Sequence, residues 1–262
     1  METLHVIKIG GNIIDDSKQL SVFLKEFAAI SEPKILIHGG GKLATELAKT
    51  LGITQTMIDG RRITDAETLN VTVMVYAGLI NKTIVSKLQA ENCNAIGFSG
   101  ADGNLIKSKK REHAEIDFGF VGDVLENGVD AKQFEQLLKM NYVPVISPIT
   151  HDGFGNLLNT NADTMASKIA SALTGKYNVV LTYCFEKNGV LMDVENDDSY
   201  FPVLDKQNYL KLKTDGIISK GMIPKLDNAF DALEFGVTRV SVCHAKHIST
   251  ITTQFKGTQL VK

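Results

Sequence analysis

Short apolar runs and helical stripes of apolar residues alternate along almost the whole chain. A short apolar run bounded by glycine or polar residues is typical of a buried strand, and apolar residues that recur every three or four positions are typical of a helix. The first pattern predicts strands at residues 4–9, 34–38, 95–98, 143–146, 179–181 and 237–242. The second predicts helices at residues 20–30, 43–51, 65–91, 162–173 and 222–235.

This alternation predicts the fold class. Strands connected through helices form parallel pairs, and the helices then cover both faces of the sheet. Residues 105–125 are polar, glycine-spaced and partly alternating, which predicts hairpins at the rim of the sheet. We therefore expect one α/β domain over residues 1–262, with approximate lobes 1–177 and 178–262 that divide near Asn178.

Composition narrows the class of protein. Of 262 residues, 44% are hydrophobic and 22% are charged, and the formal net charge is -2. Neither a nucleic acid nor an anionic membrane is an expected partner of so balanced a chain. No run approaches the roughly 18 apolar residues of a membrane helix, and the first strand begins without the features of a secretory signal. The three widely spaced cysteines predict reduced thiols in a soluble cytoplasmic protein.

Two glycine clusters directly follow predicted strands. Gly10-Gly11 comes just after Lys8, and Gly39-Gly40-Gly41 follows His38. Glycine at a strand-to-helix turn lets backbone N–H groups approach an anion, and the next helix adds its own unpaired N–H groups. The two loops together indicate a polyphosphate or carboxylate site, although no Walker loop occurs.

A dinucleotide site is an alternative for the second cluster. Gly39, Gly41 and Ala44 fit the G-x-G-x-x-[GA] pattern, and Asp59 follows at the distance of the usual ribose-binding acid. This hypothesis gives no role to Lys8 or to the first glycine loop.

Polar residues open two helices in the second half of the chain. Asn159, Asn161 and Asp163 lead into the helix at 162–173, and they exceed what helix capping alone requires. Lys225 opens a later helix behind Pro224, where the positive end of the helix dipole disfavours a cation unless an anion offsets it. Together with Lys8, these residues would surround a transferring phosphoryl group with cations and N–H donors.

Five motifs occur here in a fixed order: Lys8-x-Gly10-Gly11, His38-Gly39-Gly40-Gly41, Gly60-Arg61-Arg62-Ile63-Thr64, Asn159-x-Asn161-Ala162-Asp163 and Gly221-Met222-x-x-Lys225. The set resembles the N-acetylglutamate kinases of the amino acid kinase superfamily over nearly the whole chain. The resemblance implies a three-layer αβα sandwich around a mainly parallel sheet, with the acyl-amino-acid site in the N-terminal lobe and ATP in the C-terminal lobe. It also implies phosphorylation of the γ-carboxylate of N-acetyl-L-glutamate, or a close N-acyl-glutamate, in arginine biosynthesis. Mg²⁺ would travel with the ATP phosphates, and no other metal is expected.

The resemblance assigns a role to each matching residue. Lys8 and Lys225 would stabilise the transition state, and Asp163 would hold them in place. Arg offers a planar fork suited to a carboxylate, and a carboxylate nucleophile is already ionised at neutral pH, so no general base is needed. The implied substrate-binding residues are Gly40, Gly41, Arg62, Asn159 and Asn161, and the implied nucleotide-binding residues are Lys8, Gly10, Gly11, Thr182, Gly189, Gly221, Met222 and Lys225.

Three segments depart from the family pattern. Residues 182–189 are longer than usual after a strand and lack the usual aspartate, Lys220 stands where Gly or Asp is general, and 243–247 replaces a turn resembling Asp-Gly-Arg. The first two predict ATP recognition that differs from that of typical family members. His244 and His247 have metal-like spacing, but two exposed histidines are the favoured interpretation.

Other functions stay open at this point. The chain could be a superfamily kinase for aspartate, glutamate, carbamate or UMP, or a non-catalytic sensor, although a sensor would be expected to have lost Lys8, Asp163 or Lys225. The resemblance also implies a homodimer paired through the helix at 65–91. Because only three residues precede the first strand, where arginine-sensitive members carry an extra helix, we expect activity that ignores arginine.

Overall fold

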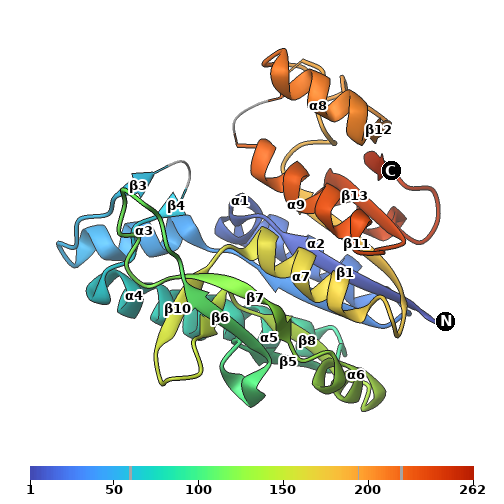
Figure 1. The fold of residues 1–262 in the computed structure, drawn as a ribbon. Coiled ribbons are helices and arrows are strands. Elements are labelled where there is room, and N and C mark those ends of the chain that lie inside the picture. The colour runs from blue at the N-terminus through green and yellow to red at the C-terminus, as the bar shows by residue number, and fades with distance from the viewer. Residues whose placement is uncertain (59–60, 194, 219–220) are drawn as a thin grey trace.

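The computed structural model describes residues 1–58, 61–193, 195–218 and 221–262, and its elements alternate as the sequence predicts (Figure 1). The strands are β1 (Thr3–Ile9), β2 (Lys34–His38), β3 (Met57–Ile58), β4 (Arg61–Arg62), β5 (Ala95–Phe98), β6 (Ile106–Lys110), β7 (Val121–Val129), β8 (Val143–Ile146), β9 (Ile149–His151), β10 (Leu157–Thr160), β11 (Asn178–Phe185), β12 (Val203–Asp205), β13 (Arg239–His244) and β14 (Thr258–Val261). The α-helices are α1 (Gly11–Asp15), α2 (Ser17–Ala28), α3 (Gly41–Thr50), α4 (Ala66–Val73), α5 (Asn81–Ala90), α6 (Ala131–Lys139), α7 (Ala162–Leu173), α8 (Lys206–Thr214) and α9 (Ile223–Glu234). A π-helical segment covers Met74–Ile80, and short 3-10 helices cover Asp102–Asn104 and Ala245–Thr250.

The centre of the molecule is an eight-stranded sheet in the order β12-β14-β13-β11-β1-β2-β8-β5. The first strand lies in the middle, where it pairs in parallel with β11 on one side and β2 on the other. Strands β13 and β14 pair antiparallel, and the other neighbouring pairs in the described sheet are parallel. The predicted α/β class with a mainly parallel sheet is confirmed.

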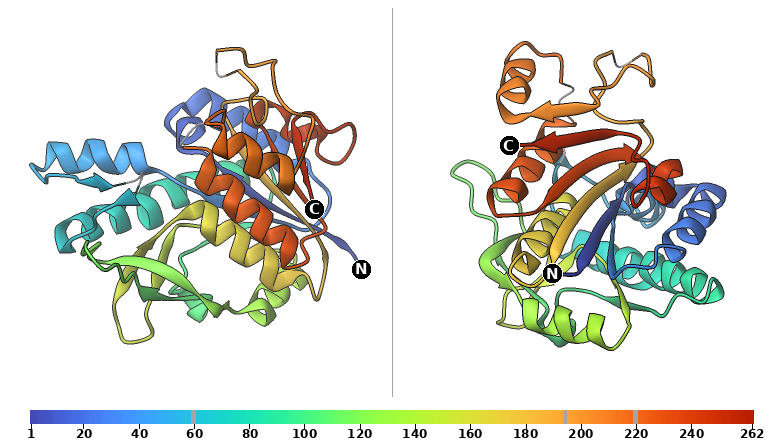
Figure 2. Two further views of the ribbon diagram at one scale, coloured as in Figure 1. Left: turned by 45° about the horizontal axis from the view of Figure 1, so that its top comes forward. Right: turned by 90° about the vertical axis from the view of Figure 1, so that its right-hand side faces the viewer.

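Helices cover both faces of this sheet (Figure 2). On one face, α7 packs on β1, β2 and β11, α9 packs on β13 and β14, and α6 packs on β8. On the other face lie α2, α5 and the segment Ala245–Thr250. Each helix turns its apolar stripe inward; in α7, Met165, Ile169 and Leu173 are fully buried. The result is a three-layer sandwich with an apolar core on each side of the sheet.

A small closed sheet in the order β10-β7-β6-β9 sits beside the main one. Its strands β6 and β7 pair antiparallel, which confirms antiparallel strands in the segment 105–125. Strands β9 and β10, outside that segment, pair antiparallel as well. The strand β10 leads directly into α7, which places Asn159 and Asn161 at the junction of the two sheets.

The predicted helix at residues 65–91 is one continuous helix with an irregular centre. Asp65 caps its start by accepting a hydrogen bond from the backbone N–H of Thr68, and the π-helical segment separates α4 from α5. Its 25 residues, Ala66–Ala90, are long and apolar enough to cross a membrane, which corrects the expectation that no segment comes close. In this structure 44% of its most apolar window is buried within the protein, where α5 packs on β5 and β8.

One strand boundary was predicted wrongly. The strand expected at residues 179–181 extends over Asn178–Phe185, in register with β1 from Thr3 to Ile9. Tyr183, Cys184 and Phe185 are therefore buried strand residues and not part of a loop. They continue the strand because β1 and β13 pair with them on both sides.

Candidate active site

The carboxyl ends of the central strands bring the predicted motifs together. Gly10-Gly11 follows β1, Gly39-Gly40-Gly41 follows β2, and both loops lie beside the start of α7. Adjacent parallel strands end at the same edge of a sheet, where ligands bind in open α/β folds. Helix α9 packs against α7, which brings Lys225 in the first turn of α9 to Asp163 in the first turn of α7.

Two ammonium groups form ion pairs with one buried carboxylate at this edge. Lys8 Nζ lies 2.6 Å from Asp163 Oδ1, and Lys225 Nζ lies 2.5 Å from Asp163 Oδ2. Lys8 and Asp163 are each only 8% exposed. Burial alone would raise the pKa of Asp163, but the two lysines together hold it well below its usual range. Asp163 is thus ionised. Burial lowers the pKa of Lys8, and the charge of Asp163 opposes this shift. With both lysines protonated, the cluster carries a net positive charge for an anionic ligand.

The first turns of α7 and α9 explain why these residues can sit there. Asp163 follows the N-cap Asn161, whose Oδ1 accepts a hydrogen bond of 2.9 Å from the backbone N–H of Thr164. A carboxylate in a first helical turn is stabilised by the helix dipole. Lys225 occupies the corresponding disfavoured place in α9, and the carboxylate of Asp163 offsets the cost.

All five predicted substrate-binding residues line one pocket of about 180 Å³. Gly40 and Gly41 come from the loop after β2, Arg62 from β4, and Asn159 and Asn161 from the end of β10 and the start of α7. Met57, Tyr76 and Thr160 also line it. The structure therefore brings together residues that lie more than a hundred positions apart in the sequence.

Arg62 is held rigidly at the wall of this pocket. Its Nη2 donates to Gly41 O and to Thr45 Oγ1, both at 2.9 Å, and its Nη1 donates to Gln55 Oε1. The residue is 8% exposed. Asn159 contacts the last residue of the arginine motif, because its Nδ2 donates to Thr64 Oγ1 at 3.0 Å. Gly60 of the same motif and Asp59 of the dinucleotide hypothesis lie outside the described residues.

Gly40 is required by its surroundings. Its φ of +148° is a backbone conformation that only glycine adopts readily. A Cβ atom at this position would lie 2.2 Å from Ile80 Cδ1, so the loop passes directly over the π-helical segment. The backbone of Gly40 and Gly41 can therefore face the pocket with no side chain in the way.

A second, apolar pocket of about 90 Å³ lies in the C-terminal part of the chain. It is lined by Gly189 and Met222, two of the predicted nucleotide-binding residues, together with Val190, Leu191 and Ile218. Gly221 precedes Met222, in the turn before α9, and Gly11 opens α1 with free space around it. Lys220 lies outside the described residues.

Thr182 does not join this group. The prediction placed it after the end of a strand, but it lies within β11 and is 1% exposed, so its side chain cannot reach a nucleotide. The strand ends at Phe185, whose Cβ lies 3.3 Å from the position of a Cβ on Gly10. Backbone pairing between Gly10 N and Cys184 O, at 2.9 Å, fixes the first glycine loop to this strand.

Sequence reasoning gave no role to three residues that support the site. Tyr183 Oη donates to the backbone oxygen of Asp163 at 3.1 Å, from the strand extension that was not predicted. His38 is fully buried, and its Nε2 lies 3.1 Å from Asn81 Nδ2 while its Nδ1 lies 2.9 Å from Gly39 O. Since the amide of Asn81 can only donate there, Nδ1 carries the proton of a neutral imidazole. No sequence signal marked Asn81, because its placement depends on the π-helical segment.

Burial lowers the pKa of His38 to about 4, because the interior disfavours its charged form; the carbonyl of Gly39 opposes this shift and the charge of Lys82 adds to it. Asn81 also donates to Val145 O at 3.0 Å. The neutral histidine and Asn81 thereby tie the second glycine loop to α5 and β8.

The cysteines and the histidine pair form no recognisable metal centre. Cys184 and Cys243 face each other across β11 and β13 with their sulfur atoms 3.7 Å apart, and all three cysteines are free thiols. The rings of His244 and His247 lie 6.2 Å apart. Within the described ranges, no three His, Cys, Asp or Glu side chains are grouped so as to hold a metal ion.

The fold and the site define an α/β protein whose glycine loops and paired lysines gather at one sheet edge, an arrangement suited to phosphorylated ligands. Residues 3–244 match the model of the amino acid kinase family, and the chain belongs to that family. Three similar proteins bear the name acetylglutamate kinase. Those of Cytophaga hutchinsonii, Bacteroides thetaiotaomicron and Methanopyrus kandleri are 53%, 52% and 37% identical, over 100%, 94% and 89% of this chain and 99%, 95% and 92% of theirs.

Solved structures show the same fold at low identity. N-acetylglutamate synthase from Neisseria gonorrhoeae, complexed with coenzyme A and N-acetyl-glutamate, matches with a TM-score of 0.83 at 19% identity; the match covers all of this chain but only 59% of that longer one. Carbamate kinase from Giardia lamblia bound to AMP-PNP matches with a TM-score of 0.71 at 14% identity, over 100% and 98% of the two chains. These likenesses concern the fold alone.

Proposed function

We propose that this protein transfers the γ-phosphoryl group of ATP to the γ-carboxylate of N-acetyl-L-glutamate, the second step of arginine biosynthesis. Its curated relatives at about 50% identity over nearly full length are named for this kinase activity. The observation that carries the proposal is the contact of Lys8 and Lys225 with the single buried carboxylate of Asp163. This cluster lies where the first glycine loop meets the predicted substrate residues.

The chemistry follows from the charges. A carboxylate oxygen of the substrate attacks the γ-phosphorus, the bond to the bridging oxygen breaks, and ADP leaves with the electron pair. Negative charge shifts from the transferred group to the bridging oxygen, and buried ammonium groups stabilise it without reorganisation. No proton needs to move, because a carboxylate is ionised at neutral pH. Asp163 is too acidic to act as a base, and its role is to orient the two lysines.

The two pockets suit the two substrates. The pocket with Arg62 and the backbone of Gly40 and Gly41 offers a buried cation and N–H donors, which suit an acidic acyl-amino acid. The apolar pocket with Gly189 and Met222 suits a nucleobase, with Gly10, Gly11 and Gly221 nearer the phosphates. Lobes 1–177 and 178–262 would then hold acyl-amino acid and nucleotide respectively.

We expect Mg²⁺ to enter this site bound to the phosphates of ATP. The carboxylate of Asp163 is paired with two ammonium groups, so it is not free to bind a metal ion. The cluster instead presents two cations to the phosphate oxygens. When bound through the phosphates, Mg²⁺ would neutralise part of their charge. Lys8 and Lys225 would supply the remaining positive charge around the transferred group.

We further propose a cytoplasmic homodimer paired through the helix Ala66–Ala90. The outer side of this helix carries two large exposed apolar residues, Met74 at 52% and Leu79 at 59% exposure. Apolar side chains this exposed on one helix support an interface with a second copy.

Phosphoryl transfer is tested by ADP release from Mg-ATP, compared across N-acetylglutamate, glutamate, aspartate, carbamate and UMP. We expect Lys8→Ala and Lys225→Ala to lower kcat for N-acetylglutamate by about a hundredfold or more with the fold intact, as for lost electrostatic stabilisers. Lys206→Ala is the matched control, because this lysine forms an exposed ion pair with Glu234 far from the cluster. Normal turnover in the first two variants would contradict phosphoryl transfer at this site, and an absence of ADP release with every acceptor would favour a sensor.

A further inference from the structure

The π-helical segment Met74–Ile80 passes beneath the second glycine loop. Tyr76 and Ile80 are four residues apart and therefore share a face of the helix. Here Leu79 is 59% exposed, whereas Ile80 is 3% exposed and buried beside Tyr76. Hydrogen bonds between residues five apart widen the turn, and such segments often occur at functional sites.

Tyr76 and Ile80 pack against the loop. A Cβ on Gly40 would lie 2.2 Å from Ile80 Cδ1 and 3.2 Å from Tyr76 Cδ1, so the tyrosine ring packs directly beneath the loop backbone. The ring is 6% exposed and lines the pocket of the predicted substrate residues. Its position is therefore set by packing on both sides.

The hydroxyl of Tyr76 points to the same place as the guanidinium of Arg62. A Cβ on Gly41 would lie 3.7 Å from Arg62 Nη2 and 3.9 Å from Tyr76 Oη. Burial raises the pKa of Tyr76, and the nearby charge of Arg62 only partly opposes this. The phenol therefore stays protonated at neutral pH and remains a hydrogen-bond donor.

We propose that Tyr76 is a further substrate-binding residue, whose hydroxyl donates to the same carboxylate that Arg62 binds. This inference rests on the proposed function. The acceptors that the described residues offer Arg62 are neutral, namely a carbonyl, a hydroxyl and an amide oxygen, so a substrate anion meets its full charge. The phenol beside the planar guanidinium adds a second hydrogen-bond donor in a fixed position. Together the two groups favour substrates that carry an α-carboxylate.

The test compares Tyr76→Phe with the unchanged protein. Loss of one hydrogen bond to a charged group should raise KM for N-acetylglutamate about tenfold, a change of about 1.4 kcal/mol, and leave KM for ATP unchanged. Tyr177→Phe is the control, because Tyr177 is also a buried tyrosine, 7% exposed, in the turn between α7 and β11. Melting temperatures of both variants establish that the fold survives.

A substrate analogue distinguishes a hydrogen bond from Tyr76 to the substrate from mere support of the glycine loop by its ring. The compound 4-acetamidobutyrate is N-acetylglutamate without its α-carboxylate, and its inhibition constant should be the same for Tyr76→Phe and the unchanged protein. An equal loss of affinity for both compounds would overturn the proposal, because Tyr76 would then act only by supporting the loop. Unchanged KM for N-acetylglutamate would overturn it as well.

Arg62→Lys distinguishes failure of this inference from failure of the proposed function. If Arg62→Lys raises KM for N-acetylglutamate and Tyr76→Phe does not, only the role of Tyr76 is wrong. If neither change affects that KM, the substrate carboxylate binds elsewhere, and the proposed location of the substrate is wrong.

Discussion

Replacing Asp163 by asparagine tests the central cluster most directly. Asparagine has nearly the same shape but no charge, so Lys8 and Lys225 would lose the carboxylate that now joins them at 2.6 and 2.5 Å. Removing one partner of a buried ion pair costs about 3–5 kcal/mol, because the charge left behind is unpaired. Asp163 is 8% exposed and contacts two cations, so we expect a loss of unfolding free energy within this range.

This loss can be measured as a melting temperature. For a chain of this size, about 1 kcal/mol corresponds to about 2–4 °C, so Asp163→Asn should lower Tm by roughly 6–20 °C. Lys225→Ala should cost less, because Asp163 keeps its contact with Lys8. Activity should fall by about a hundredfold or more, because the lysines lose their anchor. ATP should raise Tm more in Asp163→Asn than in the unchanged protein, because its phosphates meet two unpaired ammonium groups.

The result that would refute this reasoning is specific. If Asp163→Asn melts within about 2 °C of the unchanged protein and keeps its turnover, the cluster neither stabilises the fold nor organises the lysines. A large loss of Tm with normal kcat would leave Asp163 a structural residue only.

Two further predictions concern the second glycine loop and the proposed dimer. The pKa of His38 is about 4 in the folded protein and about 6.5 when unfolded, so its stabilising effect is complete above pH 6.5 and is lost as the pH falls towards 4. Urea unfolding at pH 7.5 and pH 5 should therefore show that the unchanged protein loses about 2 kcal/mol more than His38→Gln, and equal losses would contradict the buried neutral imidazole. Leu79→Asp should convert the dimer to a monomer in sedimentation, whereas Leu210→Asp, at a similarly exposed position on α8, should leave it unchanged; a monomer at the outset would refute the dimer.

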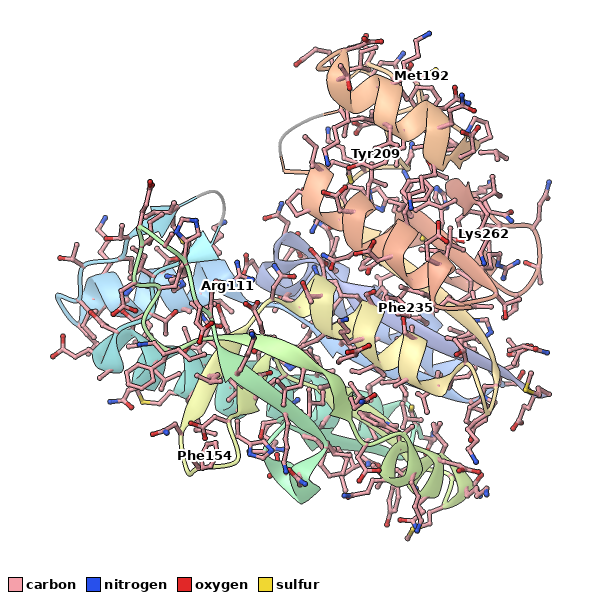
Figure 3. The ribbon with its side chains drawn as sticks, in the orientation of Figure 1. Arg111, Phe154, Met192, Tyr209, Phe235 and Lys262 are labelled. Carbon is pink, nitrogen blue, oxygen red and sulfur yellow. The ribbon has the colours of Figure 1, made fainter. Side chains whose placement is uncertain are left out.

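The small cap formed by α8 shows how side chains outside the motifs hold the C-terminal part of the chain together. Tyr209 lies between α8 and α9 (Figure 3), and its hydroxyl donates to Asp227 Oδ1 at 2.7 Å. Lys213 also contacts Asp227, at 3.0 Å. Burial and the carboxylate of Asp227 raise the pKa of Tyr209 well above its usual range. These contacts hold α8 on the helix that carries Lys225, although neither Tyr209 nor Asp227 belongs to a recognisable motif.

The sequence alone determined the order of the central strands and of most helices that cover them, but it did not predict α6, α8 or the strands β12 and β14. Apolar runs bounded by glycine, and stripes at helical spacing, depend only on neighbouring residues, and they placed β1, β2, β5, β8 and α7 within a residue or two. Motif spacing likewise identified Lys8, Asp163 and Lys225 as residues to be brought together. Their actual contacts depend on the packing of α7 on α9.

Tertiary structure decided the features for which local sequence has no distinct pattern. The extension of β11 to Phe185 arises from pairing with β1 and β13, and this pairing buried Thr182 against the expectation that it would bind a nucleotide. The π-helical turn has the same apolar composition as an ordinary helix, so only the structure reveals the widened turn beneath Gly40. A sequence specifies which residues prefer to be buried, but the register in which long helices and neighbouring strands meet is set by the packing of the whole molecule.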